Sequence, residues 1–155
     1  MILKEAPKNL INLVLMWCPR ILAVTSPIIA GGFIRAYFAG EHPSDLDLYF
    51  RNKEDLEKIK LDLTSNDWDI TFETDRAITL KQNGKMIQLI SFVYGEPSDI
   101  INSFDFTVCC AAMMLKNTKN DKDEDILSGD LLLHDDFFEH LAGRILVFNP
   151  KTISP

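Results

Sequence analysis

The 155-residue sequence lacks several features that would assign it to a common class of protein. Its three cysteines have no metal-ligand spacing and its three histidines have none either, so we expect free thiols, solvated histidines and no zinc site. The apolar stretch from Leu10 to Val24 is interrupted by Pro19-Arg20 and is too short to span a bilayer. A secretory signal peptide would need a small-residue cleavage site after that stretch, and none follows. We therefore expect a cytoplasmic protein without a membrane segment.

Basic residues are also scarce, with 16 Lys and Arg against 23 Asp and Glu and a net charge of −7. Non-specific binding of nucleic acid depends on Lys and Arg at the phosphates, so this composition does not favour it as the main task. A small nucleotide carried with Mg²⁺, or a partner that supplies a basic surface, is compatible with it. The length and the absence of repeats or linkers predict one domain over residues 1–155, without a separate C-terminal helical domain.

The most informative stretch runs from Pro27 to Phe50, and it predicts a strand, a glycine turn, a short helix, a loop and a second strand. Gly31-Gly32 follows the apolar run from Ile28 to Ala30. Two glycines allow a sharp turn there, and they let a ligand approach the backbone N–H groups. The helix expected over residues 33–38 directs its N-terminal amides and the positive end of its dipole at the same place, which suits a phosphate.

Asp45 and Asp47 are two residues apart in the second predicted strand. That spacing places both carboxylates on one face of the strand, whereas Leu46, Leu48 and Phe50 face a core. Two carboxylates on one face repel each other unless a cation lies between them, and such oxygens are the ligands that Mg²⁺ and Mn²⁺ prefer. A phosphate cradle beside the pair is what metal-assisted nucleotidyl transfer needs. The alternative is a glycine turn followed by a solvated acidic strand end.

Gly31-Gly32, Arg35 on the helix and the run from Ser44 to Asp47 together resemble the signature of the polymerase-β-like nucleotidyltransferase superfamily. The sequence is similar to CCA-adding enzymes and to small members from phages and toxin–antitoxin systems, over residues 28–105. The resemblance implies an α/β (α+β) domain with a mixed, mainly antiparallel sheet flanked by helices. It also implies metal-dependent transfer of a nucleoside monophosphate from a nucleoside triphosphate to a hydroxyl acceptor, which is an RNA, a protein or a small molecule. A nucleotide-binding or partner-binding module without turnover is the alternative on the same fold.

The resemblance also implies a role for each residue of the site. Asp45 and Asp47 would hold Mg²⁺ or Mn²⁺, and Gly31-Gly32 would receive the phosphates. Arg35 would reach the triphosphate or the loop before the aspartates, unless it forms a structural ion pair. Ser44 would orient the metal site, unless it is a plain turn residue.

The superfamily usually carries a third carboxylate on a neighbouring strand, and Asp105 is the candidate for it. Asp105 lies between Phe104 and Phe106 in an apolar stretch that predicts a strand over residues 104–115, where a charge usually has a partner or a metal. An acid satisfied by a backbone amide is the alternative. Gln88 is the rival position, and if it lies opposite the aspartate pair the third ligand is neutral and catalysis is in doubt.

Periodicity and turn residues predict the remaining elements. The expected elements are a helix over 8–17 ended by Pro19, a strand or connector over 21–26, a helix capped by Asn52 and ending near 65–66, β structure over 68–93 with a hairpin at Asn83-Gly84, a helix capped by Ser98 and running to 103, an exposed loop over 117–125, a helix over 131–142 ended by Gly143, and a final strand over 145–148.

The lack of a second domain would leave an apolar surface exposed. A second copy of the chain is a candidate to cover that surface.

Overall fold

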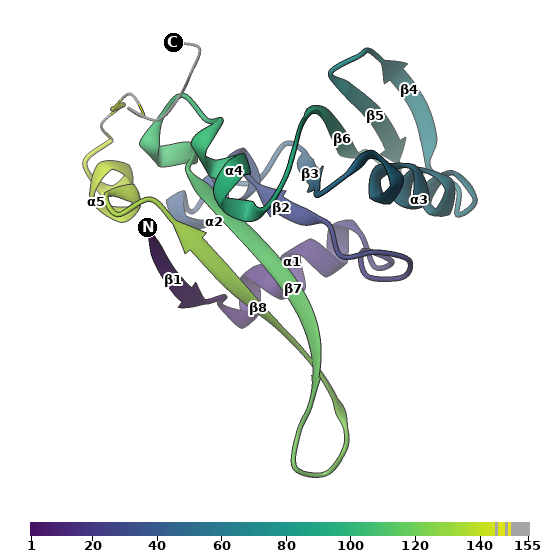
Figure 1. Ribbon diagram of the computed structural model, residues 1–155, viewed down its shortest axis with the longest axis horizontal. Helices are drawn as coiled ribbons and strands as arrows, with labels where there is room; N and C mark the ends of the chain where they lie inside the picture. Colours follow the sequence, from purple (N-terminus) through teal and green to yellow (C-terminus); the bar gives the residue numbers. More distant parts are fainter. Residues whose placement is uncertain (145, 148, 150–155) are drawn as a thin grey trace.

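The computed structural model describes residues 1–144, 146–147 and 149. These residues form one eight-stranded sheet in the order β1-β8-β7-β2-β3-β6-β5-β4, with helices on both faces (Figure 1). Among the described strands, β3 and β6 run parallel and the other neighbours run antiparallel, which confirms the expected mixed, mainly antiparallel sheet. The strands are β1 (Ile2–Glu5), β2 (Ile28–Ala30), β3 (Leu46–Phe50), β4 (Asp69–Glu73), β5 (Ala77–Gln82), β6 (Lys85–Tyr94), β7 (Ala111–Lys119) and β8 (Asp125–Leu133).

Alternation of side chains along the strands divides the core into two parts. On one face, α1, α2 and α3 pack against the sheet, and Leu46, Leu48 and Phe50 of β3 are buried beneath them. On the other face, Ile100 and Ile101 of α4 pack against a smaller apolar cluster. In Figure 1, α4 lies in front of the sheet and α1 lies behind it. The helices are α1 (Lys8–Trp17), α2 (Gly32–Ala39), α3 (Lys53–Thr64), α4 (Pro97–Asn102) and α5 (Phe137–Ala142), with a 3-10 turn η1 (Thr107–Cys109).

Several local predictions are confirmed in detail. Helix α1 has the predicted bounds, and the Asp55 N–H donates to the Asn52 side chain at 2.9 Å, so Asn52 caps α3 as expected. Asn83 and Gly84 both have positive φ, +50° and +79°, and they join β5 to β6 in a hairpin. All three cysteines are free thiols. No helix in the described part of the chain is long and apolar enough to cross a membrane.

Other boundaries differ from the predictions. The strand expected from residue 104 begins only at Ala111, after the η1 turn, and the loop expected over 117–125 is shortened to 120–124 because β7 and β8 pair up to Lys119 and Asp125. Residues 131–133 belong to β8 rather than to a helix, and the short α4 helix is capped by Glu96 rather than Ser98. Strand β1 was not predicted, residues 21–26 form a turn-rich connector, and the strand expected over 145–148 lies partly outside the described residues.

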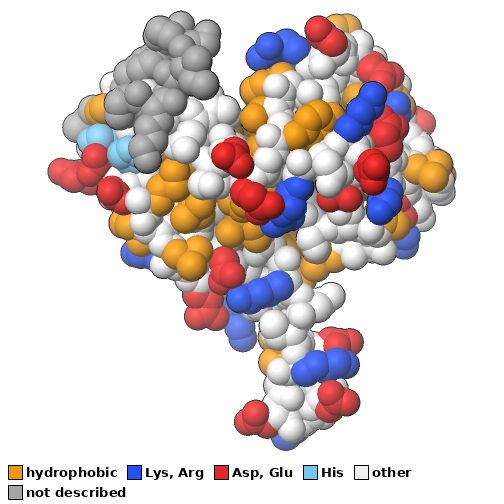
Figure 2. Space-filling model, viewed as in Figure 1, with side chains coloured by type: hydrophobic (Ala, Val, Ile, Leu, Met, Phe, Trp, Pro, Cys, Tyr) orange, Lys and Arg blue, Asp and Glu red, His pale blue; other side chains and the backbone are white. Residues whose placement is uncertain are grey.

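The β7–β8 hairpin extends well beyond the rest of the sheet. On one side β2 pairs only with residues 112–114, since Pro27 stands before β2 and has no N–H to donate. On the other side β1 pairs with residues 130–133, the Ala6 N–H donates to the Gly129 carbonyl, and Pro7 follows. Residues 115–128, called the arm below, therefore form a two-stranded ribbon without a third strand among the described residues. Figures 1 and 2 show the arm projecting from the body, with charged side chains of both signs.

Candidate functional site

The turn between β2 and α2 requires glycine at one of its two positions. Gly31 has φ +82° and ψ −133°, a conformation that L side chains rarely adopt. A Cβ at Gly31 would meet the Phe104 ring at 3.5 Å, an ordinary contact, so backbone conformation and not space requires this glycine. At Gly32 no atom lies within 4 Å of the Cβ position. The N-terminal end of α2 therefore faces open space, where a phosphate can approach its amides.

The aspartate pair lies on the sheet face that α4 partly covers, as the alternation of β3 predicted. The Ser44 hydroxyl donates to Asp45 Oδ1 at 2.9 Å, which orients that carboxylate. Asp47 lies deeper, and its buried Oδ1 has no hydrogen-bond partner in the described structure. Burial, followed by the neighbouring Asp45 carboxylate, raises the pKa of Asp47 to about 7. An unpartnered buried carboxylate oxygen is costly, and a cation between the two carboxylates would relieve that cost.

The glycine turn and the aspartate pair are adjacent because β2 and β3 pair antiparallel. The register places Ile28 opposite Tyr49 and Ile29 opposite Leu48. Continuing it by one residue puts Ala30 beside Asp47, directly before the glycine turn. The predicted phosphate cradle and the predicted carboxylate pair thus lie next to each other. Two carboxylates, one of which has a buried oxygen without a hydrogen-bond partner among the described residues, fit a hard divalent cation such as Mg²⁺ or Mn²⁺.

Gln88 occupies the position next to Asp47 on the neighbouring strand. The Cα register of the parallel strands β3 and β6 pairs Asp47 with Gln88, so the two side chains lie on the same face. The Gln88 amide donates to Met86 Sδ at 3.7 Å. The residue beside the aspartate pair on β6 is therefore neutral, and a neutral third ligand puts catalysis in doubt.

Asp105 does not lie on a strand, contrary to the prediction. It is an exposed residue in a bend between α4 and η1, and its carbonyl accepts from the Asn149 N–H at 2.6 Å. Within residues 1–144, 146–147 and 149, no group of three or more His, Cys, Asp or Glu could hold a metal ion, so the structure does not group Asp105 with the pair. Burial raises the pKa of the Cys109 thiol, the Arg35 charge lowers it and the Asp105 charge raises it.

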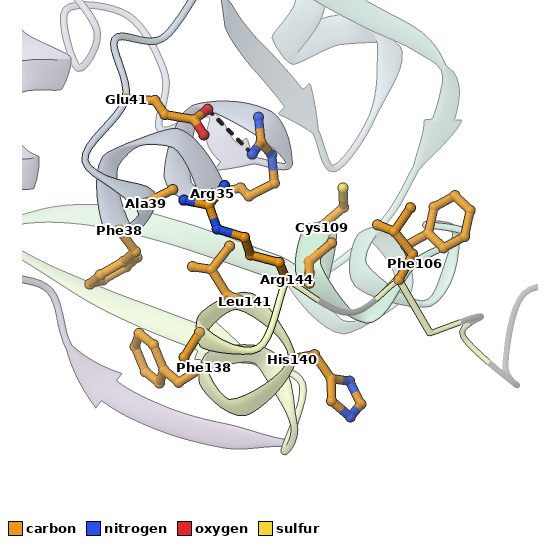
Figure 3. Close-up of a pocket in the computed structure, with 13 residues that line it drawn as sticks. Arg35, Phe38, Ala39, Glu41, Phe106, Cys109, Phe138, His140, Leu141 and Arg144 are labelled. Carbon is orange, nitrogen blue, oxygen red and sulfur yellow. Dashed lines mark ion pairs between the residues drawn. The ribbon is translucent and has the colours of Figure 1, made fainter.

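Arg35 forms the ion pair that the sequence analysis left open as an alternative. Its guanidinium lies 3.6 Å from Glu41 Oε2. The Arg35 side chain also lines a cavity of about 690 Å³ between α2, η1 and α5 (Figure 3). Neither Asp45 nor Asp47 lines this cavity. Arg35 therefore lines a cavity to which Asp45 and Asp47 do not contribute.

Sequence reasoning missed several residues of this region. Tyr49 is 4% exposed and lies beside the aspartates. Burial, followed by the Asp47 carboxylate, raises the pKa of the Tyr49 hydroxyl. The alternation that places Asp45 and Asp47 on one face of the strand also predicts Tyr49 on that face. His140 is half-buried and hydrogen-bonds to Thr107 Oγ1 through Nδ1 at 2.8 Å, contrary to the expectation of a solvated histidine. No spacing signal connects α5 to α2, since about a hundred residues separate them.

Comparisons with known proteins match the chain to a protein family. The family model described as "Gabija anti-defense 2 family protein" matches residues 8–144. A relative from Bacillus phage SPbetaL7, named Gabija anti-defense 2, is 31% identical over 129 residues. That match covers 83% of this chain and 30% of the relative.

The fold is similar to that of CCA-adding enzymes. The Thermotoga maritima CCA-adding enzyme in complex with tRNA-CCA has a TM-score of 0.66 and 18% identity, covering 96% of this chain and 36% of that chain. A CCA-adding enzyme in complex with ATP has a TM-score of 0.66 and 18% identity, covering 96% of this chain and 37% of that chain. The chain therefore has a nucleotidyltransferase-like fold, and it spans about a third of the length of these proteins.

Proposed function

The chain belongs to the Gabija anti-defense 2 family, and we propose that it is a metal-dependent nucleotidyltransferase. The proposed reaction moves a nucleoside monophosphate from a nucleoside triphosphate to a hydroxyl acceptor. The observation that carries the proposal is the pair Asp45 and Asp47 beside the open N-terminal end of α2, with a buried Asp47 oxygen that has no hydrogen-bond partner among the described residues. Carboxylates arranged in this way favour a divalent cation and a phosphate at the same place.

Each residue of the pair and of the turn has a task in the proposed reaction. Asp45, oriented by Ser44, and Asp47 would hold Mg²⁺ or Mn²⁺, which neutralises charge on the triphosphate and on the leaving pyrophosphate. The Gly31-Gly32 turn and the first amides of α2 would hold the phosphates in line with the acceptor. Because positioning and charge neutralisation carry most of the rate in such transfers, little covalent chemistry falls to the protein.

The acceptor side of the proposed site depends on Asp105. The ring of Phe104, the residue before Asp105, neighbours Tyr49 with ring centroids 5.7 Å apart, and it lies 3.5 Å from the Cβ position at Gly31 in the glycine turn. This chain of neighbours supports a position for Asp105 on the same side of the molecule as the aspartate pair. We propose that Asp105 helps to deprotonate the acceptor hydroxyl, and we expect Asp105→Asn to lower turnover while leaving nucleotide binding intact.

A second candidate function, nucleotide or partner binding without turnover, is favoured by two observations. The neutral Gln88 stands in register with Asp47, and Asp105 is not grouped with the pair. A site with two carboxylates retains one cation and a nucleotide, whereas the acceptor-side cation usually needs another acid. The same fold would then act by sequestering a nucleotide or a partner.

Incubation with Mg²⁺ and each α-labelled nucleoside triphosphate distinguishes the two candidates. The acceptors to be tested are bulk RNA, tRNA (which is present in the complex of one structural neighbour) and the protein itself. Release of pyrophosphate with transfer of label supports the enzyme, provided that Asp45→Asn and Asp47→Asn abolish it and Asp121→Asn on the arm does not. If both substituted proteins still transfer label, Asp45 and Asp47 do not form the catalytic site. Binding of nucleotide without pyrophosphate release supports the second candidate.

A further inference from the structure

The charged side chains that line the cavity between α2, η1 and α5 sum to a positive charge, whereas the net charge of the protein is negative. Arg35, Glu41 and Arg144 all line it, so two guanidinium groups and one carboxylate converge there. Arg35 pairs with Glu41 at 3.6 Å, whereas the described residues supply no ion pair to Arg144. His140, the other polar ring in the lining, is already engaged with Thr107. The cavity therefore holds one cation in excess of its carboxylate, in a chain with a net charge of −7.

The Arg144 side chain lines the cavity from the end of α5. Arg144 follows the end of α5 with φ +52°, an uncommon conformation for a residue other than glycine, and its N–H donates to the Leu141 carbonyl at 3.1 Å. In Figure 3 its side chain runs from the end of α5 toward Arg35, above Leu141. Two arginine side chains from elements far apart in the sequence thus approach one region of the cavity.

The walls of the cavity are apolar. Phe38 of α2 and Phe138 of α5 form an edge-to-face pair with ring centroids 5.0 Å apart, and Leu141 lies beside them (Figure 3). The volume of about 690 Å³ lies within the range of small-molecule sites, which typically have apolar walls and a few polar groups that orient the ligand. A ligand that matches both features has an apolar body and a single anionic group.

We propose that this cavity binds a small amphipathic anion. Its phosphate or carboxylate lies between Arg35 and Arg144, where planar guanidinium groups bind such oxygens through paired hydrogen bonds. Its aromatic or aliphatic body packs against Phe38, Phe138 and Leu141. The inference is independent of the proposed transfer reaction, since it uses neither Asp45 nor Asp47 and requires no divalent cation.

The test uses the dye 1-anilinonaphthalene-8-sulfonate with the full chain in the absence of Mg²⁺ and nucleotide. We expect saturable binding of one dye per chain, and weaker binding of N-phenyl-1-naphthylamine, which has the same apolar body without the anion. Arg144→Gln lowers the affinity for the sulfonate about tenfold, since one charge-assisted hydrogen-bond donor is lost. The matched control, Lys122→Gln at the tip of the arm, removes the same charge and leaves the affinity unchanged. Circular dichroism and thermal melting check that both variants are folded.

The half-buried Cys109 thiol in the cavity lining provides a second readout on the unmodified protein. The dye should slow alkylation of Cys109 by iodoacetamide, measured by peptide mass spectrometry. Absence of saturable dye binding, equal affinities for both dyes, an unchanged affinity of Arg144→Gln, or no protection of Cys109 overturns the proposal.

Competition identifies the source of the anion. Displacement of the dye by adenosine 5′-monophosphate but not by octanoate assigns a nucleoside phosphate, and the opposite result assigns a carboxylate. If neither compound displaces the dye, the proposal of a phosphate or carboxylate site is wrong. Asp45→Asn should bind the dye as the unmodified protein does, so the failure of this inference and the failure of the proposed reaction are separate results.

Discussion

Asp47 and Gln88 stand side by side in register on the parallel strands β3 and β6, and the Gln88 amide donates to Met86 Sδ instead of to the orphaned Asp47 oxygen. Asp47 Oδ1 thus has no donor among the described residues, although an amide side chain stands beside Asp47 on the neighbouring strand. A side chain at residue 88 that carries a charge would interact directly with the proposed cation.

Replacing Gln88 with Glu tests this relationship. In metal-free buffer the added carboxylate repels Asp47, and we expect a loss of about 1 kcal/mol, or a decrease in melting temperature of about 2–4 °C. With Mg²⁺ or Mn²⁺ the same variant should gain more stability than the unmodified protein, since a third oxygen ligand becomes available. Thermal melts with EDTA and with each cation measure both effects. Asn117→Asp on the arm controls for the added charge. If cations stabilise Gln88→Glu no more than the unmodified protein, the proposed cation position is contradicted.

Asp47→Asn should stabilise the metal-free protein. The substitution keeps the shape of the side chain and removes the charge of a carboxylate whose buried Oδ1 has no hydrogen-bond partner in the described part of the chain, so we expect a gain of about 1–2 kcal/mol in EDTA. The stabilisation that Mg²⁺ gives the unmodified protein should disappear in the variant. Urea unfolding with and without Mg²⁺ measures both quantities. A destabilised Asn variant in EDTA would mean that the carboxylate has a structural role.

The two glycines of the turn should respond differently to alanine. Gly31→Ala places a Cβ at φ +82° and should cost about 1–3 kcal/mol. Gly32→Ala meets no atom within 4 Å, so the fold should tolerate it, whereas a nucleotide phosphate resting on the turn should bind more weakly. Urea midpoints and nucleotide titrations on the pair separate the two effects. Equal losses of stability would contradict the backbone conformation given to Gly31.

The three thiols should be alkylated at different rates. Burial raises the pKa of Cys18 and Cys110 to about 12, so almost no thiolate exists at pH 8, and both side chains are inaccessible in the native protein. Cys109 is half-buried in the cavity lining and should react first with iodoacetamide. Mass spectrometry after timed labelling gives the order, and labelling in guanidinium chloride should make the three rates similar. If Cys110 reacted before Cys109, the position of Cys109 in the cavity lining would be contradicted.

The part of the site that sequence could predict is local. The strand, glycine turn, helix and acidic strand over residues 27–50 follow from short-range backbone preferences and from alternation, and the structure contains each of them in order. That Gln88 neighbours Asp47 depends on strand register, which is set by pairing across the sheet and not by either segment alone. Asp105 lies in a bend outside the sheet, so the position of its side chain depends on tertiary packing. The cavity joins α2 to α5 through tertiary packing, so no local pattern could reveal it.

The fold errors have the same origin. Residues 131–133 have apolar side chains compatible with a helix, but pairing with β1 and β7 on both sides makes them a central strand. Residues 117–125 look like a loop because a ribbon exposed on both faces needs no apolar alternation. The ribbon is held instead by its backbone ladder and by cross-strand ion pairs such as Lys119–Asp125 at 2.9 Å.

The arm has a practical consequence for experiments on this protein. Since Pro7 and Pro27 end the pairing on either side, the arm's amides should exchange with deuterium before those of the sheet below it. Its turn, in which Asn120 Oδ1 accepts from the Lys122 and Glu124 amides, is remote from the carboxylates and the cavity. A fluorophore, an affinity tag or a protease site placed in that turn would therefore report on the molecule, or immobilise it, while leaving both candidate binding regions unaltered.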